Sequence, residues 1–115
     1  MEQPHATVVL EIFSGRPDPS WPLDVFQLAE LRRRLKALRD GGEHTLPPEP
    51  GLGYRGLHVA IETGARGEIV AVRQGRVAFQ GRILIDPNRK LERWLLDTAP
   101  VMLEPALLHS IKETL

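Results

Sequence analysis

The chain has 115 residues, no cysteine, and 15 basic against 15 acidic residues, so its formal net charge is zero. The length suits a single domain, since most domains contain about 100–150 residues, and the missing cysteines exclude disulfides, thiolate metal ligands and cysteine nucleophiles. The balanced charge argues against a nucleic-acid partner, because nucleic-acid binders depend largely on an excess of basic side chains.

The N-terminal stretch lacks the pattern of a secretory signal. No lysine or arginine precedes its apolar run, and Glu11 interrupts that run. The sequence contains nothing close to the roughly 20 consecutive apolar residues of a membrane helix. We therefore expect one soluble, cytoplasmic domain over residues 1–115 that has no membrane partner.

The first predicted elements are a strand and a loop. Residues 6–13 are rich in β-branched and apolar types and alternate between two faces, with one acid, Glu11, among them. This pattern predicts a strand. Residues 14–22 contain three prolines, and each fixes its own φ and pushes the preceding residue toward extended geometry. They predict a stiff, turn-rich loop.

A helix is predicted next, over residues 25–40. Asp24 has the place of an N-cap, and Gln27 three residues later completes a capping box. Gly41 and Gly42 are expected to end the helix. Leucines recur along it at spacings of three and four and form a narrow apolar stripe, at Leu28, Leu31, Leu35 and Leu38.

A connector and several short strands follow this helix. Residues 43–53 contain three prolines and two glycines, which predict an extended connector. Residues 54–63 alternate as a half-buried strand does. Residues 68–86 predict two or three more short strands, with Gln74-Gly75 as a hairpin turn.

The C-terminal part predicts two helices. Asp86 is expected to cap the first, with Pro87 in its first turn. Its apolar side carries Leu91, Trp94 and Leu95, and residues 104–115 predict a short terminal helix. Consecutive strands joined by short turns favour antiparallel pairing. We therefore predict an α+β fold, with an antiparallel sheet of about four strands and two to three helices packed on one face.

One functional hypothesis is a small metal-dependent enzyme or metalloprotein. The four histidines lack the short spacing of a zinc-binding pair. If the strands at 6–13 and 54–63 are neighbours, however, Glu11, His58 and Glu62 gather on one face of the sheet. Two carboxylates and an imidazole can bind a metal or transfer a proton. The polar, solvent-facing side of an antiparallel sheet explains the same pattern.

A second hypothesis is an RNA-contacting surface on the arginine-rich helix. Five basic side chains fall within eight residues, Arg32, Arg33, Arg34, Lys36 and Arg39. A solvated helix face that also carries Glu30 and Asp40 explains them too. No aromatic platform of the kind that stacks on unpaired bases accompanies them.

The proline-rich loop supports the hypothesis that we prefer. Trp21 is expected to be mostly buried, while Arg16 and Asp18 flank Pro17 on a loop that is stiff enough to lose little entropy on binding. The loop is expected to lie beside Tyr54 and Arg55, residue types that are enriched at interfaces. The same stiffness would serve a purely structural turn.

With no nucleophile elbow and no phosphate-binding loop, the sequence contains no coherent catalytic set. We therefore favour a non-catalytic binding or protein-interaction module that needs no cofactor. Its partner would be a protein or a small polar ligand, and a homodimer is compatible with it. The candidate binding residues are Arg16, Asp18, Trp21, Tyr54 and Arg55.

The stretch FSGRPDPSW at residues 13–21 resembles the FSGRPNPxW motif of small, uncharacterised bacterial proteins of similar length. GLGYRG at 51–56 and LERWLL at 91–96 match the same pattern, so the resemblance covers most of the chain. Asp18 stands where the motif has asparagine. The resemblance implies a stand-alone domain and brings no activity with it.

Overall fold

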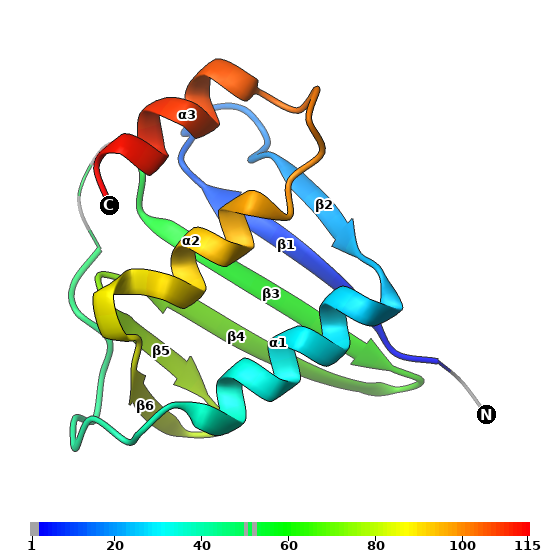
Figure 1. Cartoon of the computed structure of the whole chain (residues 1–115), viewed down its shortest axis with the longest axis vertical. Coiled ribbons are helices and arrows are strands. Elements are labelled where there is room, and N and C mark those ends of the chain that lie inside the picture. Colours follow the sequence, from blue (N-terminus) through cyan, green and yellow to red (C-terminus); the bar gives the residue numbers. More distant parts are fainter. Residues whose placement is uncertain (1–2, 50, 52) are drawn as a thin grey trace.

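In the computed structural model, which describes residues 3–49, 51 and 53–115, three helices cover one face of an antiparallel sheet (Figure 1). The six strands are β1 (His5–Glu11), β2 (Ser20–Leu23), β3 (Gly56–Thr63), β4 (Arg66–Arg73), β5 (Arg76–Phe79) and β6 (Arg82–Ile85). The helices are α1 (Val25–Ala37), α2 (Lys90–Asp97) and α3 (Pro105–Glu113), with a 3-10 turn, η1 (Pro87–Arg89), before α2. The strand order is β2-β1-β3-β4-β5-β6. The predicted α+β class, with helices on one face, is confirmed.

The sheet has six strands where about four were predicted. The missed strand is β2, which lies in the stretch predicted to be a loop. The Leu10 N–H donates to the Pro19 carbonyl at 2.9 Å, and hydrogen-bonded pairs alternate along an antiparallel ladder. The nitrogen of Pro22 therefore points away from β1. A proline is tolerated there because an edge strand has no ladder bond to lose on its outer side.

Two tight turns build the other end of the sheet. Gln74 and Gly75 both have positive φ, 51° and 78°, as do Gln80 and Gly81, at 51° and 74°. Positive φ at both residues of a two-residue loop matches the right-handed twist of the flanking strands. The predicted hairpin at Gln74-Gly75 is confirmed, and the second turn separates β5 from β6.

The capping box predicted for α1 is present. The Asp24 carboxylate accepts from the Gln27 N–H at 2.7 Å, and the Gln27 side chain accepts from the Asp24 N–H at 2.9 Å. The helix ends at Ala37, three residues before the predicted end, because the chain turns to extended geometry at Leu38.

The segment after α1 continues onto the edge of the sheet. The Ile85 N–H donates to the Arg39 carbonyl at 2.8 Å, and the Gly41 N–H donates to the Ile83 carbonyl at 2.7 Å. These bonds compete with the last turn of the predicted helix and occupy the outer side of β6. With Pro22 on the opposite edge, the sheet offers no uninterrupted ladder to a strand from another chain.

The predicted connector at 43–53 contains no helix or strand among its described residues, and residues 50 and 52 lie outside the described part. Two arginines of the sheet bind it. Arg73 donates to the Pro47 carbonyl at 2.7 Å, and Arg76 donates to the Glu43 carboxylate at 2.6 Å. The connector is therefore held along the end of the sheet.

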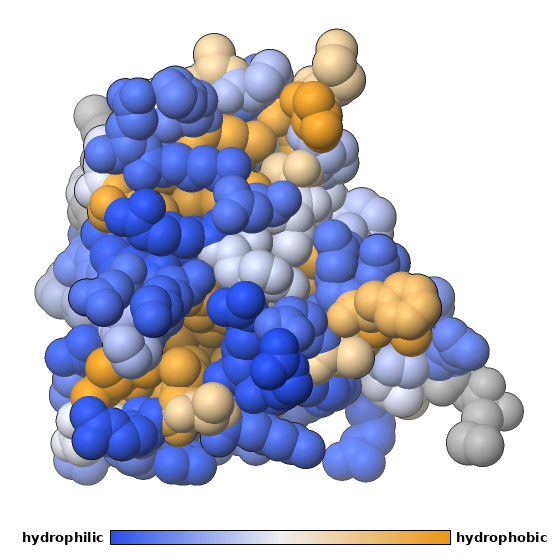
Figure 2. Space-filling view, viewed as in Figure 1, coloured by the Kyte–Doolittle hydropathy of each residue, from blue (hydrophilic) through white to orange (hydrophobic). Residues whose placement is uncertain are grey.

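The core lies between the sheet and the helices. Val8, Val59 and Val70 face one another across three strands and are completely buried. Figure 2 shows that the helix side of the surface is mostly hydrophilic, with apolar surface in separate small areas. None of the helices in the described part of the chain has the length and apolar character that spanning a bilayer requires.

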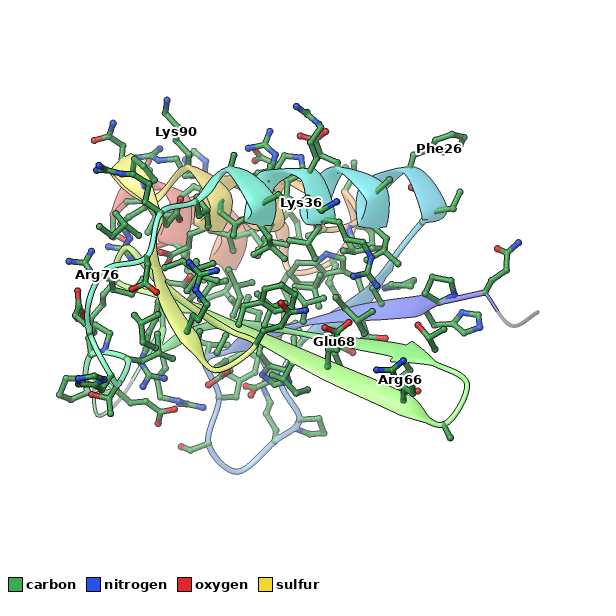
Figure 3. The ribbon with its side chains drawn as sticks, turned by 90° about the horizontal axis from the view of Figure 1, so that it is seen from below. Phe26, Lys36, Arg66, Glu68, Arg76 and Lys90 are labelled. Atoms are coloured by element: carbon green, nitrogen blue, oxygen red, sulfur yellow. The ribbon has the colours of Figure 1, made fainter. Side chains whose placement is uncertain are left out.

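The other side of the sheet, the open face, is covered by no helix in the described part of the chain (Figure 3). Glu11, His58 and Ala60 lie on it, together with Ile69, whose exposed fraction is 57%. The fold thus leaves two kinds of accessible surface, the open face and the hollows at the margins of the helix layer.

Gly56 is the position where the sheet depends most clearly on glycine. Its φ is +119°, and a Cβ there would lie 2.5 Å from the Val72 carbonyl oxygen. Gly56→Ala should therefore lower the free energy of unfolding by at least roughly 1–3 kcal/mol. Gly67, on the neighbouring strand, has no described heavy atom within 4 Å of such a Cβ. Gly67→Ala should change stability far less, and equal losses in urea denaturation would contradict this reasoning.

Candidate functional site

Trp21, the largest of the predicted binding residues, is buried as expected. Its exposed fraction is 2%. It lies opposite Val8 in the ladder between β1 and β2. The indole N–H donates to the Thr98 hydroxyl at 2.8 Å. This side chain therefore ties the edge strand to the end of α2.

Asp18 and Arg55 meet at the base of the proline-rich loop. One Asp18 carboxylate oxygen accepts from the Ile12 and Phe13 N–H groups, at 3.1 and 2.7 Å. The Arg55 guanidinium lies 4.0 Å from the other Asp18 oxygen and donates to the Phe13 carbonyl at 3.3 Å. The loop therefore folds back beside Arg55, as predicted, and both charged groups have partners within the chain.

Arg16 is the most exposed of the five predicted residues. Its side chain is 59% exposed and lies 3.2 Å from the Glu104 carboxylate. The guanidinium also stacks 3.6 Å from the centre of the Phe13 ring. Arg16 therefore links the loop to the start of α3, at a position that solvent reaches.

Tyr54 belongs to a polar cluster built around Glu92, which sequence reasoning missed. Glu92 is completely buried. It accepts from the Tyr54 hydroxyl at 2.5 Å and from two Arg89 nitrogens, both at 2.8 Å. The signal in the sequence was the spacing of this acid. Glu92 lies three residues before Leu95 and four before Leu96, and therefore on the same side of the helix as these two core leucines.

Asp86, predicted as a helix cap, closes this cluster. Its carboxylate accepts from the Leu91 N–H at 2.8 Å and from the Glu92 N–H at 3.1 Å. It therefore provides the acceptors for two N–H groups in the first turn of α2, and this contact spans the 3-10 turn η1. Burial raises the pKa of Asp86, while these two backbone hydrogen bonds act against that rise.

Tyr54 should show strongly suppressed ionisation. Burial, and then the Glu92 carboxylate, raise the pKa of Tyr54 far above its ordinary value. As pH rises past about 10, the unfolded chain loses this proton first. The stability contributed by Tyr54 is therefore complete below about pH 10 and is lost above it, at about 1.4 kcal/mol per pH unit.

Tyr54 is the single tyrosine of the chain, so the ultraviolet absorbance of tyrosinate reports on it alone. The folded protein should show no tyrosinate at a pH where the urea-unfolded chain is ionised. The Tyr54→Phe variant should lose part of the alkaline decline in stability. Ordinary titration of Tyr54 in the folded protein would contradict the prediction.

The three residues of the predicted metal set do not all lie together, and the metal-dependent function stays a prediction without the site that was expected for it. His58 Nδ1 lies 2.9 Å from a Glu11 carboxylate oxygen, since β1 and β3 are neighbours as expected. Glu62, however, pairs with His5 at the other end of β3. No group of three or more His, Asp or Glu side chains in the described residues could hold a metal ion.

The arginines of α1 contact separate partners. Arg33 and Arg34 both donate to Glu30, at 2.5 and 2.7 Å. Arg34 also lies over the Trp94 ring, 4.9 Å from its centre, and Arg32 lies 3.7 Å from Glu68 on β4. The RNA hypothesis remains a prediction. The contacts place carboxylates beside three of the five basic side chains, which reduces the free positive charge on which the hypothesis depends.

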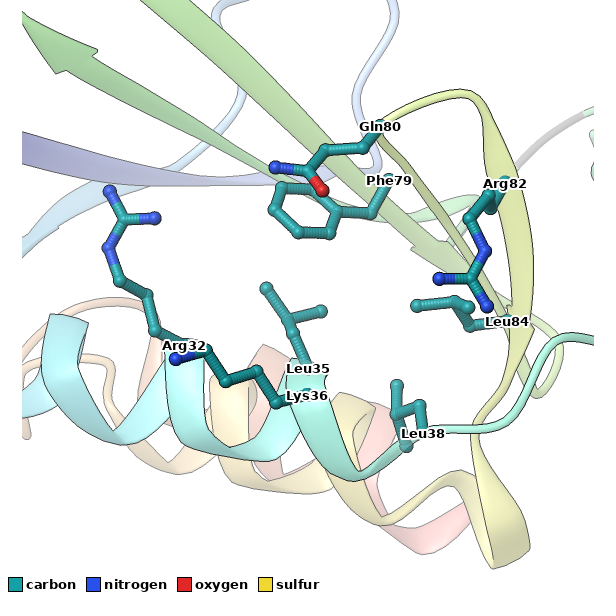
Figure 4. A pocket seen from close by; sticks show the side chains of 8 residues that line it. All are labelled: Arg32, Leu35, Lys36, Leu38, Phe79, Gln80, Arg82 and Leu84. Carbon is teal, nitrogen blue, oxygen red and sulfur yellow. The ribbon is translucent and has the colours of Figure 1, made fainter.

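A cleft of about 320 Å³ opens between the C-terminal half of α1 and the β5–β6 hairpin (Figure 4). We call it the hairpin cleft. Its apolar floor consists of Leu35, Leu38, Phe79 and Leu84, and its polar rim of Arg32, Lys36, Gln80 and Arg82. In Figure 4 the side chains of the helix and of the hairpin face each other across the opening. Two elements far apart in sequence therefore form one concave site.

The rim of the hairpin cleft carries three cations, and none of the described residues that line it is acidic. Arg82 donates to the Asp40 carboxylate at 3.1 Å, and Arg32 lies 3.7 Å from Glu68. Among the described residues, no carboxylate lies within 4 Å of the Lys36 ammonium. Exposed ion pairs contribute little to stability, so an incoming anion could displace their carboxylates.

Sequence reasoning found the cations of α1 but not the cleft. Arg32 and Lys36 lie one turn apart and flank Leu35, which is the only local signal. The rest of the lining comes from a hairpin more than 40 residues later in the chain. Comparisons of the chain with protein-family models, with curated proteins and with solved structures find no match, so the geometry alone supports the choice of site.

Proposed function

We propose that this protein is a small, non-catalytic binding module whose ligand occupies the hairpin cleft. The observation that carries the proposal is the cleft itself, with about 320 Å³ of space, an apolar floor and a few convergent polar groups. Pockets for small ligands have this composition and usually enclose about 300–1,000 Å³. The binding residues predicted from the sequence are, in contrast, mostly engaged with partners inside the chain.

The lining of the cleft supports binding rather than catalysis. Among the described residues, the lining contains no histidine, carboxylate, serine or threonine that could serve as a general base or a nucleophile. Lys36 is the one candidate, and it is exposed. A lysine nucleophile usually needs desolvation, which this exposed position does not provide, or a neighbouring cation, and the nearby Arg32 lies 3.7 Å from the Glu68 carboxylate. A ligand held here would therefore be bound and released unchanged.

Nuclear magnetic resonance with a mixture of small aromatic fragments tests the site. Backbone amide shifts should cluster at residues 32–38 and 79–84. Leu38→Trp should fill the cleft and weaken binding at least about tenfold, since it removes the space that the ligand occupies. Leu38 lies at an extended, partly exposed position, which tolerates a larger side chain.

Phe26→Trp is the matched control, because it places the same indole at the exposed start of α1, where Phe26 is 81% exposed. It should leave fragment binding unchanged. Shifts that cluster on the open face, or that persist unchanged in Leu38→Trp, would overturn the proposal.

A further inference from the structure

We infer that the ligand of the hairpin cleft is an amphipathic anion, a molecule with an apolar ring or chain and one carboxylate, sulfonate or phosphate group. This inference rests on the proposed function and adds the chemical class of the ligand. Its basis is the pairing of an apolar floor with three rim cations, of which Arg82 and Arg32 have carboxylates nearby and Lys36 has none within 4 Å among the described residues. A neutral apolar ligand would leave this charge unused, and a cation would be repelled by it.

The free positive charge is concentrated on the helix side of the cleft. Arg82 is engaged by Asp40, a carboxylate that the Gly42 N–H also binds, at 2.7 Å. Arg32 and Glu68 are 3.7 Å apart, which is longer than a hydrogen bond. Lys36 has no carboxylate within 4 Å among the described residues. The anionic group of the ligand should therefore lie at Lys36 and Arg32.

From an anionic group at Lys36 and Arg32, the apolar part of the ligand can extend in one direction, along the floor toward Arg82. Figure 4 places Arg32 and Arg82 at opposite sides of the opening, with Leu35 and Phe79 between them. Leu38 and Leu84 continue the floor toward Arg82. A ring or short chain that starts beside Lys36 can therefore lie between Leu35 and Phe79. The volume, equal to that of about ten water molecules, limits the ligand to a small one.

Lys36 also has a simpler role that the test must separate. It lies in the last turn of α1, where a cation offsets the negative end of the helix dipole. A residue with that role alone would affect the stability of the protein and leave the affinity for a ligand unchanged. The decisive measurement is therefore the dependence of affinity on the charge of the ligand.

Three probes with the same ring and different head groups make this measurement, namely 2-naphthoate, 2-naphthylmethanol and 2-naphthylmethylammonium. Each is titrated into the whole protein and followed by amide shifts at residues 32–38 and 79–84. We expect naphthoate to bind at least about tenfold more tightly than the alcohol, as a charge-assisted hydrogen bond allows. The ammonium compound should bind most weakly.

Variants locate the charge that is responsible. Lys36→Gln should remove most of the preference for naphthoate and leave the affinity for the alcohol unchanged, and Arg82→Gln should have the smaller effect. Arg33→Gln removes a cation from the same helix outside the cleft, at a side chain that is 76% exposed, and should change neither affinity. Equal binding of all three probes at the cleft would overturn the anion assignment and leave the proposed function standing. Shifts at neither segment with any probe would overturn both.

Discussion

Replacing Trp21 with alanine should lower the free energy of unfolding by about 3–5 kcal/mol, as the truncation of a large buried aromatic side chain does. The side chain is 2% exposed, and its indole N–H donates to the Thr98 hydroxyl at 2.8 Å. The substitution removes the larger of the two core contacts of β2, leaving Leu23, and also removes the hydrogen bond to Thr98, so it leaves a cavity at the edge of the sheet. Urea denaturation followed by circular dichroism measures the loss.

Two matched variants show which interaction matters. Trp21→Phe keeps most of the burial and loses the hydrogen bond, so it should cost about 0.5–1.5 kcal/mol beyond the smaller loss of ring area. Arg16→Ala removes an exposed ion pair and a stacking contact from the same loop, and should cost about 1 kcal/mol or less. Equal losses for Arg16→Ala and Trp21→Ala would contradict the assignment of Trp21 as the anchor of the loop.

The elements that could be predicted from the sequence are those with local causes. The start of α1 follows from Asp24 and Gln27, which bond to each other across three residues. The β4–β5 hairpin follows from Gln74-Gly75, and the cap of α2 from Asp86. In each case the residues that make the contact are within six positions of one another.

The errors arose where distant segments determine the local structure. Three prolines favour a loop in isolation, but β2 forms because Trp21 can be buried only if its strand pairs with β1. The helix pattern of α1 continues to Asp40, but the backbone at Arg39 and Gly41 bonds to β6 instead. Neither bond can be recognised in the sequence pattern of either segment, because each joins residues more than 40 positions apart in the chain.

The candidate site was predictable in part for the same reason. Arg32 and Lys36 can be recognised in the sequence as cations on an amphipathic helix, where charged side chains normally face solvent. Their functional meaning depends on Phe79 and Leu84, which turn the exposed margin of a helix into one wall of a cleft. The buried Glu92 likewise accepts a hydrogen bond from Tyr54, which lies 38 residues earlier in the chain.

Both edges of the sheet are blunted, by Pro22 on β2 and by the segment after α1 on β6. Association through strand pairing is therefore disfavoured. The helix side is mostly hydrophilic (Figure 2), and large exposed apolar patches are the usual mark of protein interfaces. On the helix side, these features accord with the proposed concave site for a small ligand.

Removing the Glu92 carboxylate should destabilise the protein about as much as removing Trp21. Glu92 is completely buried and is the shared acceptor of Tyr54 and Arg89. Glu92→Ala leaves the Arg89 guanidinium and the Tyr54 hydroxyl without their acceptor, and breaking a buried pair in this way costs about 3–5 kcal/mol. Glu30→Ala is the matched control, because Glu30 also accepts from two arginines but does so at the helix surface. Its loss should be far smaller, and similar losses for the two variants would show that Glu92 is not buried in solution.

The ionisation of Tyr54 gives a second measurement that does not depend on stability. The Glu92 charge and its hydrogen bond both raise the pKa of Tyr54. Glu92→Gln removes the charge but keeps an oxygen that can accept from the Tyr54 hydroxyl, so this variant should fold with the cluster largely intact. Its tyrosinate absorbance should appear at lower pH than in the unaltered protein, because burial of the ring still opposes deprotonation but the negative charge of Glu92 no longer does. An unchanged titration in folded Glu92→Gln would mean that Tyr54 is held neutral by burial alone, and that the contact with Glu92 contributes geometry and no charge coupling.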